Sequence, residues 1–315
     1  MEDNNIAYAC INKDKSVRDS STSGGVYTVF ADYILKKEGI VYGVSFDRDF
    51  NVVFEDSDHV DYRAFRGSKY PQAKLGDTFK EVKRNLDMGR YVLFTGCPCQ
   101  VAGLKSFLNK EYDKLVTVDF ICMGIGSPYL WQKYLNETCG TEEIRAVRFK
   151  DKSKGWHNFS TVIETNRKKY KDIGVENLYM KSYLKRVNIR PSCYECRFKG
   201  ATGRRSDITI SDCWGIDKIM PQIDDNKGIS GVYVNTENGA KLFEAVADRL
   251  SIYKLSRKDT IACNGYYQRP VELPIEREDF WKDLKSLSFG ATVKKYYGEA
   301  KHRFDIKSRI IRLLK

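Results

Sequence analysis

The sequence predicts an α/β protein with a mixed, partly parallel sheet flanked by helices and a basic helical C-terminal segment. Two buried strands at 91–95 and 115–121, with a helix between them, form a βαβ unit, which requires parallel strands. Two short apolar runs at 40–46 and 52–54 are joined by a polar turn and predict an antiparallel pair. Together these observations predict a sheet that is parallel in one part and antiparallel in another.

Periodicity and capping residues predict the other elements. Apolar positions from Val26 to Ile34 recur at helical spacing, with Ser23 as the expected N-cap and Gly39 after the last turn. Leu75 to Leu86 mark a second amphipathic helix. The same reasoning predicts strands at 145–149, 159–164, 207–212 and 231–235, and helices at 101–108, at 173–184 and from 236.

Length and composition are those of an ordinary globular protein. The 315 residues are 42% hydrophobic and 30% charged, enough for one large domain. We assign residues 1–270 to that domain and 271–315 to a basic helical extension, because basic residues become more frequent after Lys282. The polar start has no apolar leader, and no stretch approaches the ~20 apolar residues of a membrane span, so we expect a cytoplasmic protein.

A net charge of +12 permits anionic partners such as phosphorylated cofactors, nucleic acid or membranes. No zinc-finger or RNA-binding signature accompanies the basic residues, so we expect no nucleic-acid binding. From Phe304 to Leu314 apolar residues are interspersed with basic ones, a pattern that allows peripheral contact with a membrane. A helix packed on the domain with its charges in water explains the same pattern.

Four cysteines carry the clearest chemical signal. Cys99 and Cys122 each follow a strand of the βαβ unit, at the strand ends where parallel sheets bind ligands. Cys193 and Cys196 form a Cys-x-x-Cys pair. If the two strands are neighbours, ~5 Å apart, both of the first two sulfurs can reach one site. Four converging thiolates in a reducing compartment predict an iron–sulfur cluster or zinc.

This choice of four ligands, the cysteine set, leaves alternatives open. Cys97 and Cys213 lie near the same elements, and either can replace one of the four. Free cysteines are also often buried small hydrophobes. Zinc remains an alternative to a cluster, although structural zinc sites more often use two close pairs of cysteines.

Three further motifs have a plain structural explanation beside a functional one. Ser23, Gly24 and Gly25 begin a helix and can offer N–H groups to a phosphate, but ordinary capped helices use the same residues. One loop combines two cations with an aromatic ring, which suits a pyrophosphate and a flat ring: Arg66, Gly67, Ser68, Lys69 and Tyr70. A solvated basic loop also explains it. Trp156 and His157 are candidate catalytic residues, and His157 can move a proton near neutral pH. A structural aromatic residue and a surface histidine explain this pair at least as well.

Taken together, these segments resemble the coenzyme F420 hydrogenase/dehydrogenase beta-subunit family, in a short form without the N-terminal ferredoxin module. The resemblance extends over about residues 18–250, and its motifs occur in family order. The motifs are Ser23–Gly25, Arg66–Tyr70, 96–104, 119–124 with Ser127 and Pro128, 149–152 with Gly155 and Trp156, Cys193 with Cys196, and 207–215.

The resemblance implies a flavin and iron–sulfur oxidoreductase that passes electrons between an external donor and a small organic acceptor through FAD. It implies that the cysteine set binds a 4Fe-4S cluster, and that the turn at 23–25 and the loop at 66–70 help to hold FAD. Archaeal members use a deazaflavin coenzyme as acceptor. Short bacterial forms often occur among genes for surface polysaccharide synthesis, which leaves both contexts open for this chain.

The chain also departs from the family. It has no Cys-x-x-Cys-x-x-Cys run near its start, so we expect electrons from a separate donor such as a ferredoxin, and an oligomer is compatible with this. The family usually has a hydroxyl residue at position 97 and often a large or aromatic residue at position 213. A metal-stabilised accessory or scaffold protein without redox catalysis is the alternative function, and a basic peripheral protein is a third.

Overall fold

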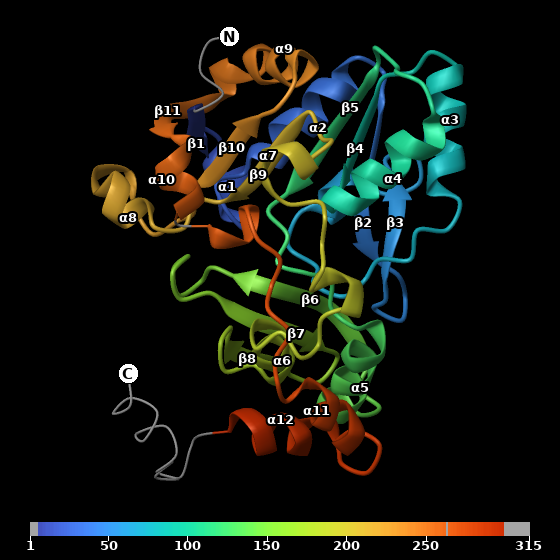
Figure 1. Cartoon of the computed structure of the whole chain (residues 1–315), viewed down its shortest axis with the longest axis vertical. Coiled ribbons are helices and arrows are strands. Elements are labelled where there is room, and N and C mark those ends of the chain that lie inside the picture. Colours follow the sequence, from blue (N-terminus) through green and yellow to red (C-terminus); the bar gives the residue numbers. More distant parts are fainter. Residues whose placement is uncertain (1–5, 263, 299–315) are drawn as a thin grey trace.

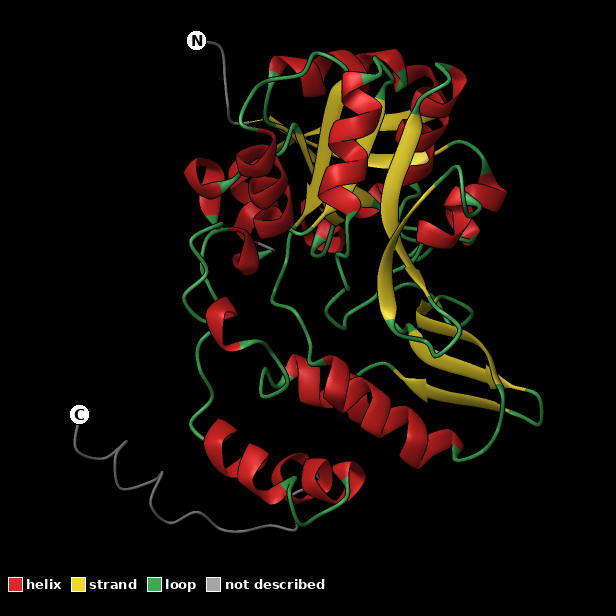
Figure 2. Cartoon of the chain, turned by 90° about the vertical axis from the view of Figure 1, so that its right-hand side faces the viewer, coloured by secondary structure: helices red, strands yellow, loops and turns green. Residues whose placement is uncertain are grey.

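The computed structural model describes residues 6–262 and 264–298 and confirms the α/β prediction. Two sheets of different size carry the fold, the larger above the smaller in Figure 1. Figure 2 shows helices beside the larger sheet and further helices below the smaller one. The predicted segment from Phe304 to Leu314 lies outside the described residues.

The larger sheet consists of β1 Ile6–Asn12, β2 Ile40–Phe46, β3 Val52–Asp56, β4 Val92–Gly96, β5 Leu115–Phe120, β9 Ile208–Asp212, β10 Ser230–Val234 and β11 Leu250–Ser256. Its strand order in the described residues is β11-β1-β10-β9-β5-β4-β2-β3. The central strands β2, β4, β5 and β9 are parallel, and the pairs outside them are antiparallel. Both sequence predictions, the βαβ unit and the antiparallel pair β2–β3, are therefore confirmed.

Helices cover both faces of this sheet because its strands are apolar on both sides. The helices around it are α1 Lys15–Asp19, α2 Val26–Lys36, α3 Thr78–Asp87, α4 Pro98–Leu108, α7 Gly200–Gly203, α8 Ile216–Ile219, α9 Glu237–Ala245 and α10 Arg257–Ala262. Val41 and Leu93 pack toward α2 and α9, whereas Tyr42 and Phe94 pack toward α3 and α4. No helix in the described ranges has the length and apolar content needed to cross a membrane.

The smaller sheet is antiparallel and has its own apolar core. Its strands are β6 Ile144–Asp151, β7 Ser160–Thr165 and β8 Lys169–Ile173. The helices packed on this core are α5 Pro128–Cys139, α6 Leu178–Leu184, α11 Arg277–Asp283 and α12 Phe289–Tyr297. Residues 277–297, which the sequence places in a C-terminal extension, thus share a core with the middle of the chain.

Two local predictions are wrong. The N-cap of α2 is Gly25, whose φ of 85° suits glycine, and Ser23 Oγ instead donates to the carbonyl of Ile229 at 2.6 Å. The segment 173–184 is not one helix, because β8 ends at Ile173 and α6 begins only after Asn177, whose side chain accepts the N–H of Met180.

Candidate functional site

The side chains of the cysteine set line one pocket. The other residues that line it are Pro98, Met123, Gly124, Ile125, Phe198 and Lys199. The pocket has about 310 Å³ of empty space, including part that is open to solvent. All four cysteines are half-buried, so the pocket lies near the surface. Three segments that are distant in sequence therefore bring their thiols to one place.

The parallel strands β4 and β5 position the first two cysteines. Gly96 pairs with Asp119 across these strands, so the segments that leave both strand ends start side by side. Cys97 is the N-cap of α4, and Gln100 Oε1 accepts the N–H of Cys97 at 2.8 Å. Cys99 therefore lies in the first turn of α4, where the helix dipole favours a thiolate.

The Cys-x-x-Cys segment is fixed to the loop that follows β5. The N–H of Arg190 donates to the carbonyl of Ile125 at 2.9 Å, and the hydroxyl of Tyr183 donates to the carbonyl of Gly124 at 2.8 Å. A Cβ at Gly124 would lie 2.5 Å from Cγ2 of Ile189, so glycine is required for this close approach. These contacts hold Cys193 next to the loop that carries Cys122.

Hydrogen bonds among the thiols divide them into a donor and two acceptors. The thiol of Cys97 bonds to Cys122 and Cys99, and these bonds raise the pKa of Cys97. The hydrogen bond from Cys97, with the nearby charge of Arg190 contributing, lowers the pKa of Cys99 to about 7. The bond from Cys97 also lowers the pKa of Cys122. Both shifts favour the thiolate form that a metal ligand needs.

Cys193, a third member of the cysteine set, and Lys199, which also lines the pocket, complete the electrostatics. Burial raises the pKa of Cys193 to about 11. Lys199 Nζ donates to the carbonyls of Cys122 and Tyr266, and burial lowers the pKa of this lysine. In the described ranges no three His, Cys, Asp or Glu side chains form a group that could hold a single metal ion.

The two spare thiols have different positions. Cys97 is in direct contact with two members of the cysteine set. Cys213 is buried in an apolar cluster with Trp156 and Ile216 and is not among the residues that line the pocket. Of the two alternatives raised by the sequence, Cys97 alone is within reach of this pocket.

The structure brings the other two predicted motifs together. Thr22 Oγ1 accepts the N–H of Ser68 at 3.0 Å, and Arg66 Nη1 donates to Ser20 Oγ at 3.2 Å. The Nε of Arg66 is buried and has no partner among the described residues. Lys69 Nζ donates to two carbonyls of its own loop, and burial lowers the pKa of this lysine to about 7. Two cationic side chains of this loop thus lack a carboxylate partner in the described structure.

The glycine turn itself packs tightly against the sheet. The N–H of Gly24 donates to Ser230 Oγ at 3.0 Å, and a Cβ at Gly24 would lie 2.3 Å from the carbonyl oxygen of Cys10. Lys152 Nζ donates to the carbonyl of Ser23 at 3.1 Å. The turn is therefore held against β1 and β10, and its role in phosphate binding stays a prediction.

Tyr70 joins this region to the cysteine pocket. Its ring lies 4.6 Å from the ring of Tyr183, whose hydroxyl bonds to Gly124 beside Cys122. The carbonyl of Tyr70 also accepts the N–H of Gly126 at 2.9 Å. The loop that we expect to hold a flavin is thus linked, through Tyr183 and Gly126, to the segment whose Gly124 and Ile125 line the pocket.

The candidate catalytic residues lie elsewhere. Trp156 is fully buried and stacks on Trp214 with ring centroids 4.6 Å apart. His157 is exposed, and its Nε2 lies 2.7 Å from Asp224 Oδ2. Neither residue lines the cysteine pocket. Sequence reasoning passed over Lys150, which pairs with Asp212 and lies close enough to Tyr70 for a hydrogen bond. Lys150 could have been found from its position in the family motif at 149–152.

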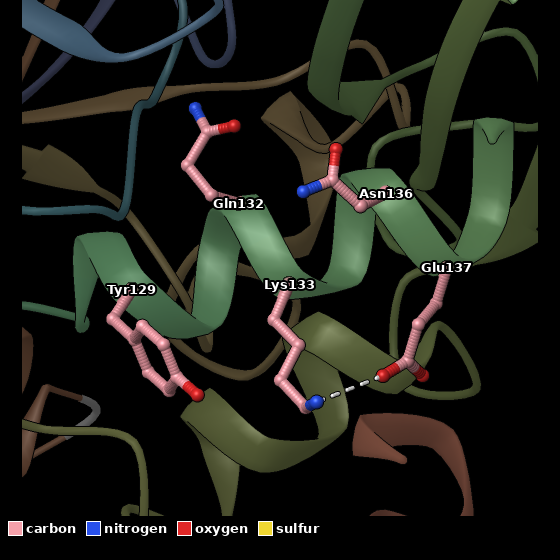
Figure 3. Close-up of a pocket in the computed structure, with 5 residues that line it drawn as sticks. All are labelled: Tyr129, Gln132, Lys133, Asn136 and Glu137. Atoms are coloured by element: carbon pink, nitrogen blue, oxygen red, sulfur yellow. Dashed lines mark ion pairs between the residues drawn. The ribbon is translucent and has the colours of Figure 1, made fainter. Parts of the chain in front are cut away.

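A second hollow runs along α5, as Figure 3 shows. Its lining residues, Tyr129, Gln132, Lys133, Asn136 and Glu137, all belong to this one helix. Glu137 pairs with Lys133 and also accepts the N–H groups of Phe289 and Gly290 at the start of α12. The hollow has no thiol, and its carboxylate is already engaged in holding α12.

Comparisons with known proteins agree with this architecture. A family model that describes the C terminus of the coenzyme F420 hydrogenase/dehydrogenase beta subunit matches residues 89–258. A chain of the F420-reducing NiFe hydrogenase complex from Methanosarcina barkeri is similar in structure, with a TM-score of 0.53 and 18% sequence identity. The match covers 82% of this chain and 89% of that one, and at this identity it shows the fold. No curated protein matches the sequence.

The matched region contains β4, β5, β9 and every member of the cysteine set. It covers more than half of the chain. The family's description refers to subunits of redox enzymes. The resemblance drawn from the sequence motifs is therefore confirmed, and the chain belongs to the family defined by the C-terminal region of coenzyme F420 hydrogenase/dehydrogenase beta subunits.

Proposed function

We propose that this protein is a flavin- and 4Fe-4S-dependent oxidoreductase that passes electrons between an external donor and a small organic acceptor through FAD. The observation that carries the proposal is the convergence of Cys99, Cys122, Cys193 and Cys196 on one pocket. These four residues would hold the cluster, and the loop at 66–70 would help to hold the flavin. A deazaflavin or an intermediate of polysaccharide synthesis is a candidate acceptor.

The donor set fits an iron–sulfur cluster. Four thiols are the ligands that a 4Fe-4S cluster requires, and they line a pocket whose remaining wall is largely apolar. The lowered pKa values of Cys99 and Cys122 favour the thiolate form that binds iron. Lys199, whose ammonium bonds to the carbonyl of Cys122, adds positive charge close to a site that carries thiolates.

The loop at 66–70 fits the anionic part of a dinucleotide. The buried Nε of Arg66 has a free donor in the described structure, and Lys69 is a cation without a carboxylate partner. Both groups can donate to phosphate oxygens. A bound flavin would accept and release electron pairs, while Tyr70 connects this loop through Tyr183 to Gly124, which lines the cysteine pocket.

The alternative is an accessory or scaffold protein that is stabilised by zinc or by a cluster and has no redox activity. The four thiols that line the pocket are the observation in its favour, because zinc also binds thiolates, although no three such side chains in the described ranges are arranged to hold a single ion. Under this alternative the protein would contain metal but no flavin.

Anaerobic purification followed by analysis of iron, sulfide, zinc and flavin separates the two functions. The proposal expects a yellow-brown protein with equal amounts of iron and sulfide and one flavin per chain. Reduction by dithionite should bleach the visible spectrum, and a small organic oxidant should restore it. A colourless protein that contains one zinc per chain and no flavin would contradict the proposal and favour the accessory function.

A further inference from the structure

We infer that the surface around the mouth of the cysteine pocket is the docking site for a small acidic electron-transfer protein of the ferredoxin class. This surface, called the mouth surface, consists of Phe120, Arg190, Arg197, Lys199 and Tyr266. The inference rests on the proposed function and adds to it the place and the chemistry of the donor. Its basis is an unbalanced positive charge combined with exposed aromatic rings next to half-buried thiols.

The cations of the mouth surface lie against the pocket. Arg190 and Arg197 are both exposed. The N–H of Arg190 donates to the carbonyl of Ile125 at 2.9 Å, and Ile125 lines the pocket. Arg197 stands between Cys196 and Phe198, which both line the pocket, and its guanidinium lies 5.3 Å from the Phe198 ring centroid.

These arginines are not neutralised within the described structure. Arg190 donates to the uncharged amide of Gln72 at 3.4 Å, and Arg197 contacts a ring. Elsewhere on the surface, cations commonly pair with acids, as Arg148 does with Glu164 at 2.6 Å. Glu195 is an exposed carboxylate of the same segment. It carries one negative charge against the positive charges of Arg190, Arg197 and Lys199, so the net charge of the mouth surface is positive. Complementary charge speeds the encounter of electron-transfer partners and orients them.

Exposed aromatic rings accompany the charge. Phe120, two residues before Cys122, is 40% exposed, and Tyr266 is 38% exposed. The carbonyl of Tyr266 accepts a hydrogen bond from Lys199, which also bonds to the carbonyl of Cys122. Aromatic and arginine side chains are enriched in protein interfaces, and redox partners use small ones, below ~1,200 Å². An acidic partner with a small apolar centre therefore matches this surface.

The proposed encounter exchanges electrons and no atoms. Each docking event oxidises the donor by one electron and reduces the protein's redox group by one electron. Two such events, with one proton from solvent, supply the hydride equivalent that an organic acceptor takes up. A transient, salt-sensitive complex suits this purpose, because the oxidised donor must leave before the next one binds.

Binding of an oxidised plant-type ferredoxin tests the inference without relying on activity. We would measure its dissociation constant by calorimetry on the anaerobically purified full chain, at low and at physiological salt. Arg197→Glu should weaken binding about tenfold at low salt, and Arg197→Lys about twofold, because only charge reversal repels the partner. Arg167→Glu is the matched control, since Arg167 is exposed in the turn between β7 and β8 and carries the same charge. It should change the dissociation constant less than about twofold.

Equal weakening by Arg197→Glu and Arg167→Glu would overturn the inference, because it would show attraction to overall charge alone. Binding to anionic vesicles that is lost in Arg197→Glu, without binding of ferredoxin, would assign the surface to a membrane instead. Protein that contains iron and flavin but does not bind ferredoxin would reject the docking site and leave the proposed function standing. Protein that binds ferredoxin through Arg197 but lacks iron and flavin would reject the proposed function and keep the docking site.

Discussion

Cys193 ends the short helix Pro191–Cys193 and faces the pocket from the segment that is farthest in sequence from Cys99. We predict that Cys193→Ser removes most of the visible absorbance of the cluster, because a serine hydroxyl is a much poorer ligand for iron than a thiolate. Iron content and the absorption spectrum of anaerobically purified protein provide the measurement.

Cys97→Ser is the matched control for this prediction. Cys97 contacts the thiols of Cys99 and Cys122 but is assigned no place in the cysteine set. Its serine variant should keep the full iron content. If Cys97→Ser loses the absorbance and Cys193→Ser keeps it, the ligand assignment is wrong and Cys97 takes the fourth position.

Replacing Lys69 should stabilise the flavin-free protein but weaken its binding of FAD. Burial lowers the pKa of this lysine to about 7, so the folded state holds its proton less tightly than the unfolded state does. The cost of burying its charge is therefore present at low pH and disappears as the pH rises from 7 toward the ordinary lysine pKa of about 10.4. In flavin-free protein, Lys69→Met should raise the melting temperature at pH 6.5 by about 2 °C and should have little effect at pH 10.

The same variant should bind FAD about tenfold more weakly, because it loses a cation that we place against the phosphates. Fluorescence titration of the flavin-free protein measures this affinity. Destabilisation of Lys69→Met at pH 6.5 would contradict the cost of burying this charge, and binding of FAD as tightly as by the original chain would remove Lys69 from the proposed flavin site.

Strand β5 is tied to the segment before β9 by a buried ion pair. Arg204 Nη1 lies 2.9 Å from Asp119 Oδ1, and both side chains are almost completely buried. Arg204→Met leaves the Asp119 carboxyl buried without its cation, and we predict a loss of about 3 kcal/mol in the free energy of unfolding. Adding Asp119→Asn to Arg204→Met should recover part of this loss, as urea denaturation would show. Equal stability of the single and double variants would mean that the pair is not coupled.

The central elements are predictable from the sequence because their signals are local. β4, α4 and β5 follow one another with clear periodicity, so the meeting of Cys99 and Cys122 can be expected from the order of residues alone. The antiparallel edge cannot be predicted in this way. β1 pairs with β10 and β11, more than two hundred residues away, and no local pattern indicates those partners.

One helix was overlooked, and the expected approach of Cys193 to the other cysteines rests on no local pattern. The helix α5 carries a readable signal, since Ser127 caps it, Pro128 begins it, and Leu130, Trp131, Tyr134 and Leu135 recur at helical spacing. The approach of Cys193 to Cys122 has no such signal. It depends on the contacts of Tyr183 and Arg190 with the loop after β5, which exist only in the folded chain.

The cysteine pocket lies where the two cores of the molecule meet. Cys99 begins a helix that packs on the larger sheet, whereas Cys193 packs against the core of the smaller one. A bound cluster would therefore link the two units. We predict that a chelator lowers the melting temperature and speeds amide hydrogen exchange at residues 187–199 more than in β1 and β11. Uniform acceleration, or the same response in Cys193→Ser protein that lacks iron, would contradict this linkage.

The wide sequence spacing of the cysteine set also affects how the protein is made. A ribosome must synthesise nearly two-thirds of the chain before Cys196 is added, and until then Cys97, Cys99 and Cys122 lack the full third segment as a partner. A chain released earlier lacks two of its four thiols and cannot close the pocket. Insertion of the proposed metal centre would therefore be restricted to late nascent or finished chains, and retention of metal would report that synthesis has passed this point.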